Sequence, residues 1–258
     1  MRSIWTGAIG FGLVNIPIKM YSATESSNLN LDMLDKNGHA PIKYQRVNEH
    51  TGKEVEWGNI IKGYKMDDDY VILDDKDFEA ASPKKTKTVE IADFVKEDEI
   101  SSMYYETPYY LEPDKSGTRP YKLLLEALKK TKKVGIATFV MRNKESLAVL
   151  RPEGDVIVLN KIRFDEEIRE TSDLTLPSNT TVKPAELKMA ISLIDQLTAK
   201  FDISKYKDTY NDELMKIIKA KSKGKKIKAP QMKVVHSKAK DLMDQLKASL
   251  DVKRKKSA

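Results

Sequence analysis

Two acidic clusters are the first groups in the sequence whose residue types could do chemistry. They read "MDDDY" at 66–70 and "LDDKD" at 73–77, and grouped carboxylates are ligands that divalent metal ions accept. Neither cluster has the turn glycine and the distal glutamate of a calcium-binding loop, which favours solvated surface charge. We therefore predict no metal site, and a metal-dependent nuclease that uses these clusters stays open as an alternative.

The other residue types of catalytic and metal sites are scarce or lack their companions. The chain has no cysteine, and its histidines, His39, His50 and His236, form no H-E-x-x-H pattern. "SPKK" fits S-x-x-K without an S-D-N or K-T-G partner, and no G-x-S-x-G is present. The glycines of "GAIGFG" are spaced G-x-x-G-x-G, which is not the dinucleotide-binding spacing. The sequence thus predicts a protein that is not an enzyme and has no cofactor.

Lysine and arginine are abundant, and they are segregated along the chain. The net charge is +7, yet residues 219–258 hold 14 Lys and Arg against three Asp. Residues 36–65 and 115–163 are two further basic blocks, whereas 66–106 is acidic. Basic blocks on an acidic body favour a polyanion partner, because each cation that neutralises a phosphate releases counterions. The lack of cysteine and of any apolar run of ~18 residues predicts a cytoplasmic protein without a membrane partner.

Most of the elements that must position these charges are expected to be strands. We predict strands within 1–22, a hairpin at 39–57, and strands in "DYVILDD", "KTVEIADFV", "SMYYETPYYLEP", "VGIATFVM", "SLAVLR" and "DVIVLNKIRF". One helix interrupts them in "RPYKLLLEALKKT", with Tyr121, Leu124, Leu125 and Leu128 on one face. This order predicts a mainly β protein with α appendages (α+β), built on a β-barrel or sandwich.

The chain after the core domain (1–183) is expected to be helical and basic. A helical arm at 184–218 holds one helix that starts at Pro184 and a second from about Asp208 to Lys221. The first presents Leu187, Ile191, Ile194 and Leu197 on one face, and the second turns Tyr210, Leu214, Ile217 and Ile218 inward. A basic flexible linker (219–236) precedes a short helix with a basic tail (237–258). The apolar stripe of that last helix is Leu242, Met243, Leu246 and Leu250, and such a stripe docks on its own protein or on a partner.

Five blocks, which sample nearly the whole chain in order, carry a resemblance to a known family. They are "RSIWTGAIGFGLVNIPIKMYSAT", "PIKYQRVNEHTGKEVEWGNIIKGYK", "YYLEPDKSGTRPYKLLLEAL", "LAVLRPEGDVIVLNKIRFDEEIR" and the terminal "DLMDQLKASLD". Together they resemble the bacterial Ku proteins, which are homodimeric rings around double-stranded DNA ends. Those proteins act in non-homologous end joining and recruit a multidomain ATP-dependent ligase. The resemblance implies a Ku-type β-barrel whose bridge insertion, at about 30–100, arches over the duplex.

The resemblance also bears on zinc. In relatives the bridge is similar to a degenerate zinc ribbon, with Cys pairs flanking a hairpin such as "VNEHTG". This chain has Asn48 and Thr51 where such a pair would lie, so we expect no zinc. The hairpin would then be stabilised by packing and by the second subunit.

A ring explains how DNA ends can be recognised without catalytic chemistry. It reads phosphates and shape, so it binds any sequence, and it can load only over an end. The candidate DNA-binding residues, taken from the basic blocks, are Lys43, Arg46, Lys53, Lys62, Arg119, Lys122, Arg142, Lys144, Lys223, Lys225, Lys226 and Lys228. The candidate ligase-interaction site is the stripe of Leu242, Met243, Leu246 and Leu250. Such a protein would be cytoplasmic and nucleoid-associated. The alternative is an open-surface architectural β-barrel that binds nucleic acid without end specificity.

Overall fold

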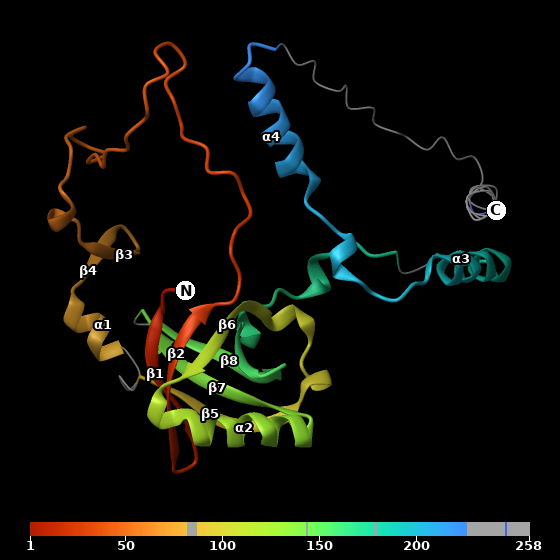
Figure 1. Cartoon of the computed structure of the whole chain (residues 1–258). Coiled ribbons are helices and arrows are strands. Elements are labelled where there is room, and N and C mark those ends of the chain that lie inside the picture. The colour runs from red at the N-terminus through yellow and green to blue at the C-terminus, as the bar shows by residue number, and fades with distance from the viewer. Residues whose placement is uncertain (82–86, 143, 178–179, 226–245, 247–258) are drawn as a thin grey trace. The chain divides into compact units, whose positions relative to one another are not determined.

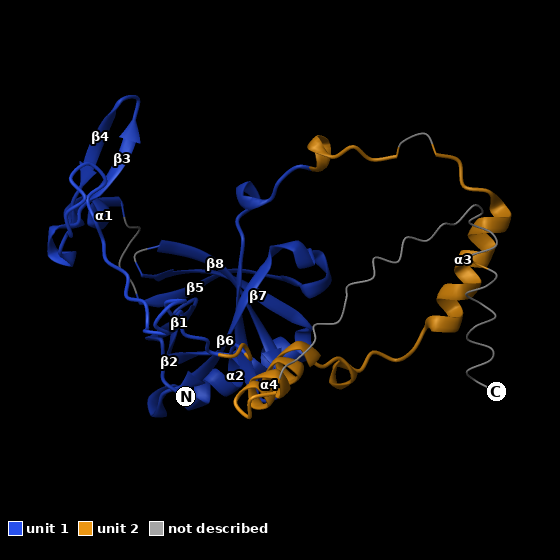
Figure 2. Ribbon diagram, turned by 90° about the horizontal axis from the view of Figure 1, so that it is seen from above, with its two compact units in different colours: residues 1–26, 30–170 blue, residues 27–29, 171–258 orange. Residues whose placement is uncertain are grey.

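The computed structural model describes residues 1–81, 87–142, 144–177, 180–225 and 246 of the chain (Figure 1). The chain separates into two units, which are considered one at a time below (Figure 2). The first unit comprises residues 1–26 and 30–170, and the second comprises 27–29 and 171–258. In the described part of the chain, no helix combines the length and the apolar character that crossing a membrane requires.

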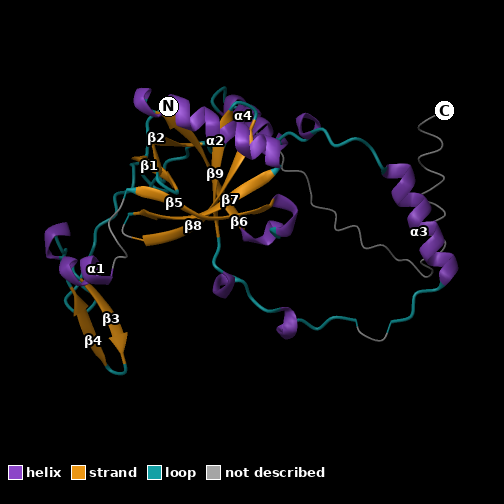
Figure 3. Ribbon diagram, turned by 90° about the horizontal axis from the view of Figure 1, so that it is seen from below, coloured by secondary structure: helices purple, strands orange, loops and turns teal. Residues whose placement is uncertain are grey.

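Seven strands of the first unit close into a barrel in the order β1-β2-β6-β9-β8-β7-β5 (Figure 3). They are β1 (Trp5–Phe11), β2 (Val14–Ser22), β5 (Thr88–Lys96), β6 (Tyr105–Pro113), β7 (Lys133–Met141), β8 (Lys144–Glu153) and β9 (Val156–Ile162). Neighbouring strands are antiparallel except β1 and β5, which are parallel. The prediction of a mainly β protein built on a barrel, with α appendages, is confirmed.

The low-charge opening stretch forms the first two barrel strands. Ile9, Ile16, Ile18 and Met20 are fully buried and belong to the main core cluster. Gly7 is needed for close approach, because a Cβ there would lie 2.2 Å from the carbonyl oxygen of Lys87. Gly7 therefore allows close packing of strand β1 and is not part of a phosphate-binding loop.

Helix α2 (Thr118–Thr131) packs its apolar face into the barrel core. The four residues predicted for this face, Tyr121, Leu124, Leu125 and Leu128, are all buried. The Tyr121 hydroxyl donates to the Leu111 carbonyl oxygen at 2.6 Å and accepts from the Ile157 N–H at 2.7 Å. This hydroxyl therefore joins the helix to β6 and β9.

Residues 24–81, which overlap the bridge insertion expected at about 30–100 and which we name the bridge segment, contain little regular structure, and none of them is buried. Their elements are η1 (Trp57–Asn59), the antiparallel pair β3 (Lys62–Met66) and β4 (Asp69–Leu73), and α1 (Asp75–Ala81). The hairpin predicted at 39–57 is reduced to a turn at 48–53 with isolated bridges Leu34–Pro41 and Val47–Glu54. A continuous ladder is absent because these residues bury no face that would hold two strands in register.

Both units also contain short 3-10 helices between their longer elements. They are η2 (Glu97–Glu99), η3 (Ser102–Tyr104), η4 (Lys115–Gly117), η5 (Asp165–Glu167), η6 (Thr171–Asp173) and η7 (Ile203–Lys205).

The second unit contains α3 (Pro184–Leu197) and α4 (Thr209–Lys221), close to the predicted limits. The predicted apolar face of α3 is open to solvent, since Leu187, Ile191, Ile194 and Leu197 are 49–63% exposed. The inward face predicted for α4 is wrong in part, because Tyr210 is 70% and Ile218 is 38% exposed. Periodicity identifies an apolar face, but it does not supply the neighbour that would cover it.

Candidate nucleic-acid interface

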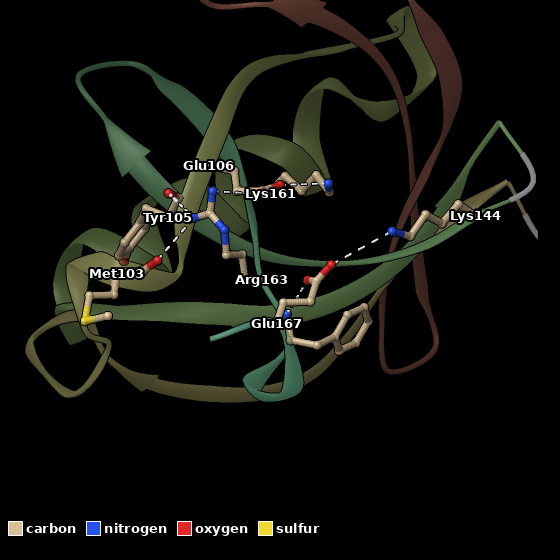
Figure 4. A network of polar contacts seen from close by, with 8 residues as sticks. Met103, Tyr105, Glu106, Lys144, Lys161, Arg163 and Glu167 are labelled. Carbon is tan, nitrogen blue, oxygen red and sulfur yellow. Dashed lines mark hydrogen bonds and ion pairs between the residues drawn. The ribbon is translucent and has the colours of Figure 1, made fainter. Parts of the chain in front are cut away.

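Cations and carboxylates meet where β9 ends, in a group that we name the Glu106 cluster: Glu106, Lys144, Lys161, Arg163 and Glu167 (Figure 4). Glu106 is paired with Lys161 of β9 and with Arg163 just after it: Lys161 Nζ lies 2.7 Å from one carboxylate oxygen and Arg163 Nη2 lies 3.2 Å from the other. Lys144 Nζ lies 3.9 Å from the Glu167 carboxylate. The cluster holds three cations and two anions, so it keeps an excess of positive charge.

Strand pairing brings these residues together. In β9 the alternate residues Ile157 and Leu159 belong to the main core cluster, and Lys161 continues the same side of the strand. β9 pairs with β6 from Leu111–Ile157 to Tyr105–Ile162, with an irregularity between Tyr105 and Pro108. That register carries Glu106 beside Lys161. The end of β9 is thus where the apolar alternation gives way to charge.

Arg163 is also fixed through backbone atoms. Its Nη1 donates to the carbonyl oxygens of Met103 and Tyr105, at 3.1 and 3.3 Å. Its own backbone N–H donates to the Tyr104 carbonyl oxygen at 2.9 Å. A guanidinium with several donors can bridge such groups in one geometry, so Arg163 ties the end of β9 to the start of β6.

The electrostatics of the cluster favour the ionised form of Glu106. The hydrogen bond from Lys161 is the main cause that lowers the pKa of Glu106, with further lowering from the charges of Lys161, Arg163 and Lys144. Partial burial acts in the opposite direction. At neutral pH, Glu106 is therefore a negative counter-charge to the two cations beside it.

Sequence reasoning named Lys144 but missed Lys161 and Arg163. Both lie in the basic block at 115–163. Their position two and four residues after the core residue Leu159 is the only sequence feature that could have singled them out, because the block contains 12 Lys and Arg in all.

The structure separates the four predicted cations of that block into two places. Lys144 belongs to the Glu106 cluster, and Arg142 lies in the turn between β7 and β8 with a positive φ of 54°. Arg119 and Lys122 are exposed near the start of α2, on either side of Tyr121 in the sequence, and Tyr121 contacts the start of β9. The block thus supplies cations near both ends of β9 rather than one patch.

Lys122 is the least available of these cations. Its Nζ lies 3.1 Å from the carboxylate of Glu126, four residues on in the same helix. The hydrogen bond and charge of Lys122 are the main causes that lower the pKa of Glu126, so this carboxylate stays ionised beside it.

The bridge segment presents Lys43, Arg46, Lys53 and Lys62, all exposed. The Arg46 guanidinium carbon lies 4.4 Å from the centre of the Trp57 ring, and Lys62 Nζ lies 4.6 Å from the centre of the Phe78 ring. Such contacts are worth about 0.5–1 kcal/mol at exposed sites. They restrain two of the four predicted cations without neutralising them.

In the turn at 48–53, backbone N–H groups donate to the side chains of Asn48 and Thr51, the two residues that stand where a zinc-binding Cys pair would lie. Asn48 Oδ1 accepts from the backbone N–H groups of His50 and Thr51, each at 3.0 Å. The Thr51 hydroxyl accepts from the Lys53 N–H at 3.4 Å. An amide and a hydroxyl that are already engaged do not match the thiolate donors of a structural zinc site. Among the described residues, no group of three or more His, Cys, Asp or Glu could hold a metal ion.

The acidic clusters have structural uses. Asp67 lies in the β3–β4 turn with φ 52°. Asp74 Oδ1 accepts from the backbone N–H groups of Lys76 and Asp77, at 2.8 and 3.0 Å, at the start of α1. Carboxylates suit a helix start because they accept from its free N–H groups. These contacts account for part of the acidic sequence without catalysis.

Of the predicted C-terminal site residues, the structure describes only three. Lys223 and Lys225 follow α4, and both backbone N–H groups donate to the Ala220 carbonyl oxygen. Leu246 is half-buried. Lys226, Lys228, Leu242, Met243 and Leu250 lie outside the described residues.

Comparison with known proteins identifies the family. The sequence model for the "Ku70/Ku80 beta-barrel domain" matches residues 10–189 of the chain. The chain belongs to the Ku family. The range matched by the Ku domain includes the bridge segment and six whole barrel strands, together with the end of β1.

Relatives of the chain in this family are named "Non-homologous end joining protein Ku". The protein from Cupriavidus necator is 43% identical over 226 residues, which cover 85% of this chain and 67% of that protein. The Coxiella burnetii protein is 38% identical, with 98% of this chain and 96% of that protein covered. The Bacillus subtilis protein is 40% identical, with coverage of 99% and 83%. The resemblance to bacterial Ku proteins is therefore confirmed along nearly the whole chain.

Proposed function

We propose that this member of the Ku family binds ends of double-stranded DNA in non-homologous end joining. In the proposed form, a homodimeric ring threads onto the duplex, protects and bridges the ends, and recruits and stimulates an ATP-dependent ligase. The observation that carries the proposal is the similarity to proteins named for non-homologous end joining over 98% of this chain and 96% of one relative. The Ku domain match supports it independently.

The type and placement of the charged side chains support contact with phosphates rather than bases. Among the described residues, the predicted cations lie on the bridge segment, on α2, at or next to strand ends and just after α4, and the four of the bridge segment are all exposed. Lys and Arg that neutralise phosphates position a duplex without reading its sequence. This suits a protein that must accept whatever sequence a break leaves.

The apolar surface of the bridge segment supports a dimer. Large residues there are exposed, among them Leu31 at 64%, Tyr44 at 78%, Trp57 at 72%, Ile61 at 67% and Tyr64 at 68%. A two-stranded hairpin such as β3–β4 is at best marginally stable alone in water. A second copy would cover such residues, so we expect a mass in solution of twice the 29.3 kDa of one chain. A monomer at all working concentrations would contradict the ring.

Threading is tested by comparing a linear duplex with the same sequence as a covalently closed circle. A ring loads only over an end, so we expect the closed circle to lose most of the binding. Equal affinity for the two forms would refute threading and favour the alternative, an open-surface barrel without end specificity.

The C-terminal segment is assigned two contributions, to DNA and to the ligase. Removal of residues 219–258 deletes 14 Lys and Arg. We expect weaker DNA binding and a flatter dependence on salt, by about 0.9 in log–log slope for each phosphate that the truncated chain no longer neutralises. The same truncation should reduce stimulation of the ligase. A shorter truncation that removes only 237–258 is the matched control, since it keeps the basic linker. An unchanged salt slope in the longer truncation would contradict contact between the tail and DNA.

The nuclease alternative has its own test. Magnesium should produce no strand cleavage, and a variant that replaces Asp67, Asp69, Asp74 and Asp75 should therefore leave DNA processing unchanged. Magnesium-dependent cleavage that this variant abolishes would establish the alternative.

A further inference from the structure

We propose that Trp57 is a positioning residue that holds the Arg46 guanidinium in the orientation needed to bind a DNA phosphate. The inference rests on the proposed function and refines it, because it ranks one of the predicted cations above the others. It assigns a role to an aromatic residue that the charge pattern did not identify.

Backbone pairing places the two side chains together. The Val55 N–H donates to the Arg46 carbonyl oxygen at 2.8 Å, and Val47 bridges Glu54. Arg46 therefore stands opposite Val55, and Trp57 is two residues further along the same run of chain. Residues two apart in extended chain lie on the same side, and diagonal neighbours across a pair are within reach of long side chains. The 4.4 Å separation between the guanidinium carbon and the ring centre agrees with that placement.

The guanidinium carbon of Arg46 lies over the Trp57 ring, 4.4 Å from its centre, and this contact uses no oxygen acceptor. A guanidinium is planar, and its five N–H donors lie in that plane. The contact with the Trp57 ring pairs none of these donors with an oxygen acceptor, so donors stay available for the two oxygens of a phosphate. Among the described residues, Arg46 forms no ion pair that would compete. By contrast, Lys122 is paired with Glu126, and Arg163 binds two backbone carbonyl oxygens and Glu106.

The advantage is preorganisation. A free arginine side chain loses rotamer freedom when it binds, and a side chain that is already held loses less. Trp57 itself is 72% exposed, and η1 contains no buried residue. It belongs to neither core cluster. Within the part of the chain that the structure describes, the contact with Arg46 is thus the specific interaction of the Trp57 ring.

The test is a double-mutant cycle on binding of a short blunt duplex, measured across a salt series. We expect Trp57→Leu to weaken binding by about threefold to tenfold with an unchanged salt slope, because the charge remains. Trp57→Phe should restore most of the affinity, since a ring face is restored. Arg46→Met should weaken binding and lower the slope by about 0.9 for each Arg46 that contacts a phosphate. The variant with both Arg46→Met and Trp57→Leu should bind no more weakly than Arg46→Met alone.

Control variants separate the positioning role of Trp57 from loss of folding and from loss of charge. Circular dichroism of every variant checks that the fold is intact, and Lys43→Met is the matched control for loss of one nearby cation. If the parent chain binds duplex and Trp57→Leu binds equally well, the positioning role is wrong while the proposed function stands. Additive losses in the double variant would also refute it, because Trp57 would then act independently of Arg46. A parent chain that does not bind duplex would overturn the proposed function together with this inference.

Discussion

Removal of the Tyr121 hydroxyl is expected to destabilise the barrel strongly. The side chain is 6% exposed, and its oxygen stands between the last residue pair of β6 and β9, Leu111 and Ile157. It donates to the carbonyl of the first and accepts from the N–H of the second. Burial is the main cause that raises the pKa of Tyr121, so the hydroxyl stays neutral and able to donate. Tyr121→Phe keeps the ring and deletes only this link.

The magnitude follows from the two bonds. A net contribution of about 1 kcal/mol for each hydrogen bond, together with the cost of a buried N–H left without a partner, gives a loss of about 2–3 kcal/mol. For a domain of about 150–250 residues, each kcal/mol lowers Tm by roughly 2–4 °C. Unfolding in urea, followed by far-ultraviolet circular dichroism, measures this loss, and the m-value should not change.

Two neighbouring tyrosines provide matched Tyr→Phe controls. The Tyr104 hydroxyl is exposed and donates to Asp165 at 2.8 Å, so Tyr104→Phe should cost less than about 0.5 kcal/mol. The Tyr105 hydroxyl is buried and has no hydrogen-bond partner among the described residues. Tyr105→Phe should therefore be neutral or stabilising, because an unpaired polar atom is removed. A loss below about 0.5 kcal/mol for Tyr121→Phe, or equal losses for all three variants, would refute this reasoning.

Two further predictions concern charge and backbone strain. The pKa of Glu106 is lowered from its ordinary value of 4.5, and the hydrogen bond from Lys161 is the main cause. The ionised Glu106 therefore contributes its full stabilisation of the folded state above pH 4.5, and this contribution is lost as the pH falls through the lowered pKa. Glu106→Gln should cost about 1–2 kcal/mol near pH 7 in urea unfolding, and the difference from the parent should shrink below pH 4.5; a pH-independent difference would contradict it. Arg142 has φ 54°, so Arg142→Gly should raise stability by about 0.5–1 kcal/mol. The same change should weaken duplex binding, with Arg142→Asn as control for the backbone. If Arg142→Gly is less stable than the parent chain, the backbone of Arg142 is not strained. If Arg142→Gly binds duplex as well as the parent chain does, Arg142 does not contact DNA.

Local patterns predicted the elements whose faces are defined within one segment. The four buried residues of α2 follow from the i, i+3, i+4, i+7 spacing, because this spacing places all four on one face of a helix. The barrel strands follow from alternation and turn residues. The same reasoning failed for the hairpin predicted at 39–57, where the turn at 48–53 forms but a continuous ladder does not. Pairing there depends on what covers the strands, which a local pattern does not contain.

The Glu106 cluster shows why the candidate site was only partly predictable. Glu106 and Lys161 are 55 positions apart in the sequence, and they meet through the register of β6 with β9. An irregularity in that register, between Tyr105 and Pro108, shifts the pairing. The density of Lys and Arg identifies the basic block that contains Lys161 and Arg163. It does not identify which of the 12 cations in that block lie beside Glu106, because that depends on strand pairing between distant segments.

Retention on closed DNA tests the central claim, threading of a ring over an end, most directly. The protein is loaded on linear duplex, the ends are joined covalently, and the complex is moved to high salt, which removes phosphate contacts. Threading predicts that the protein stays on the closed circle and leaves promptly when one cut restores an end. Loss from the closed circle at the same rate as from linear DNA would contradict threading and leave an open binding surface.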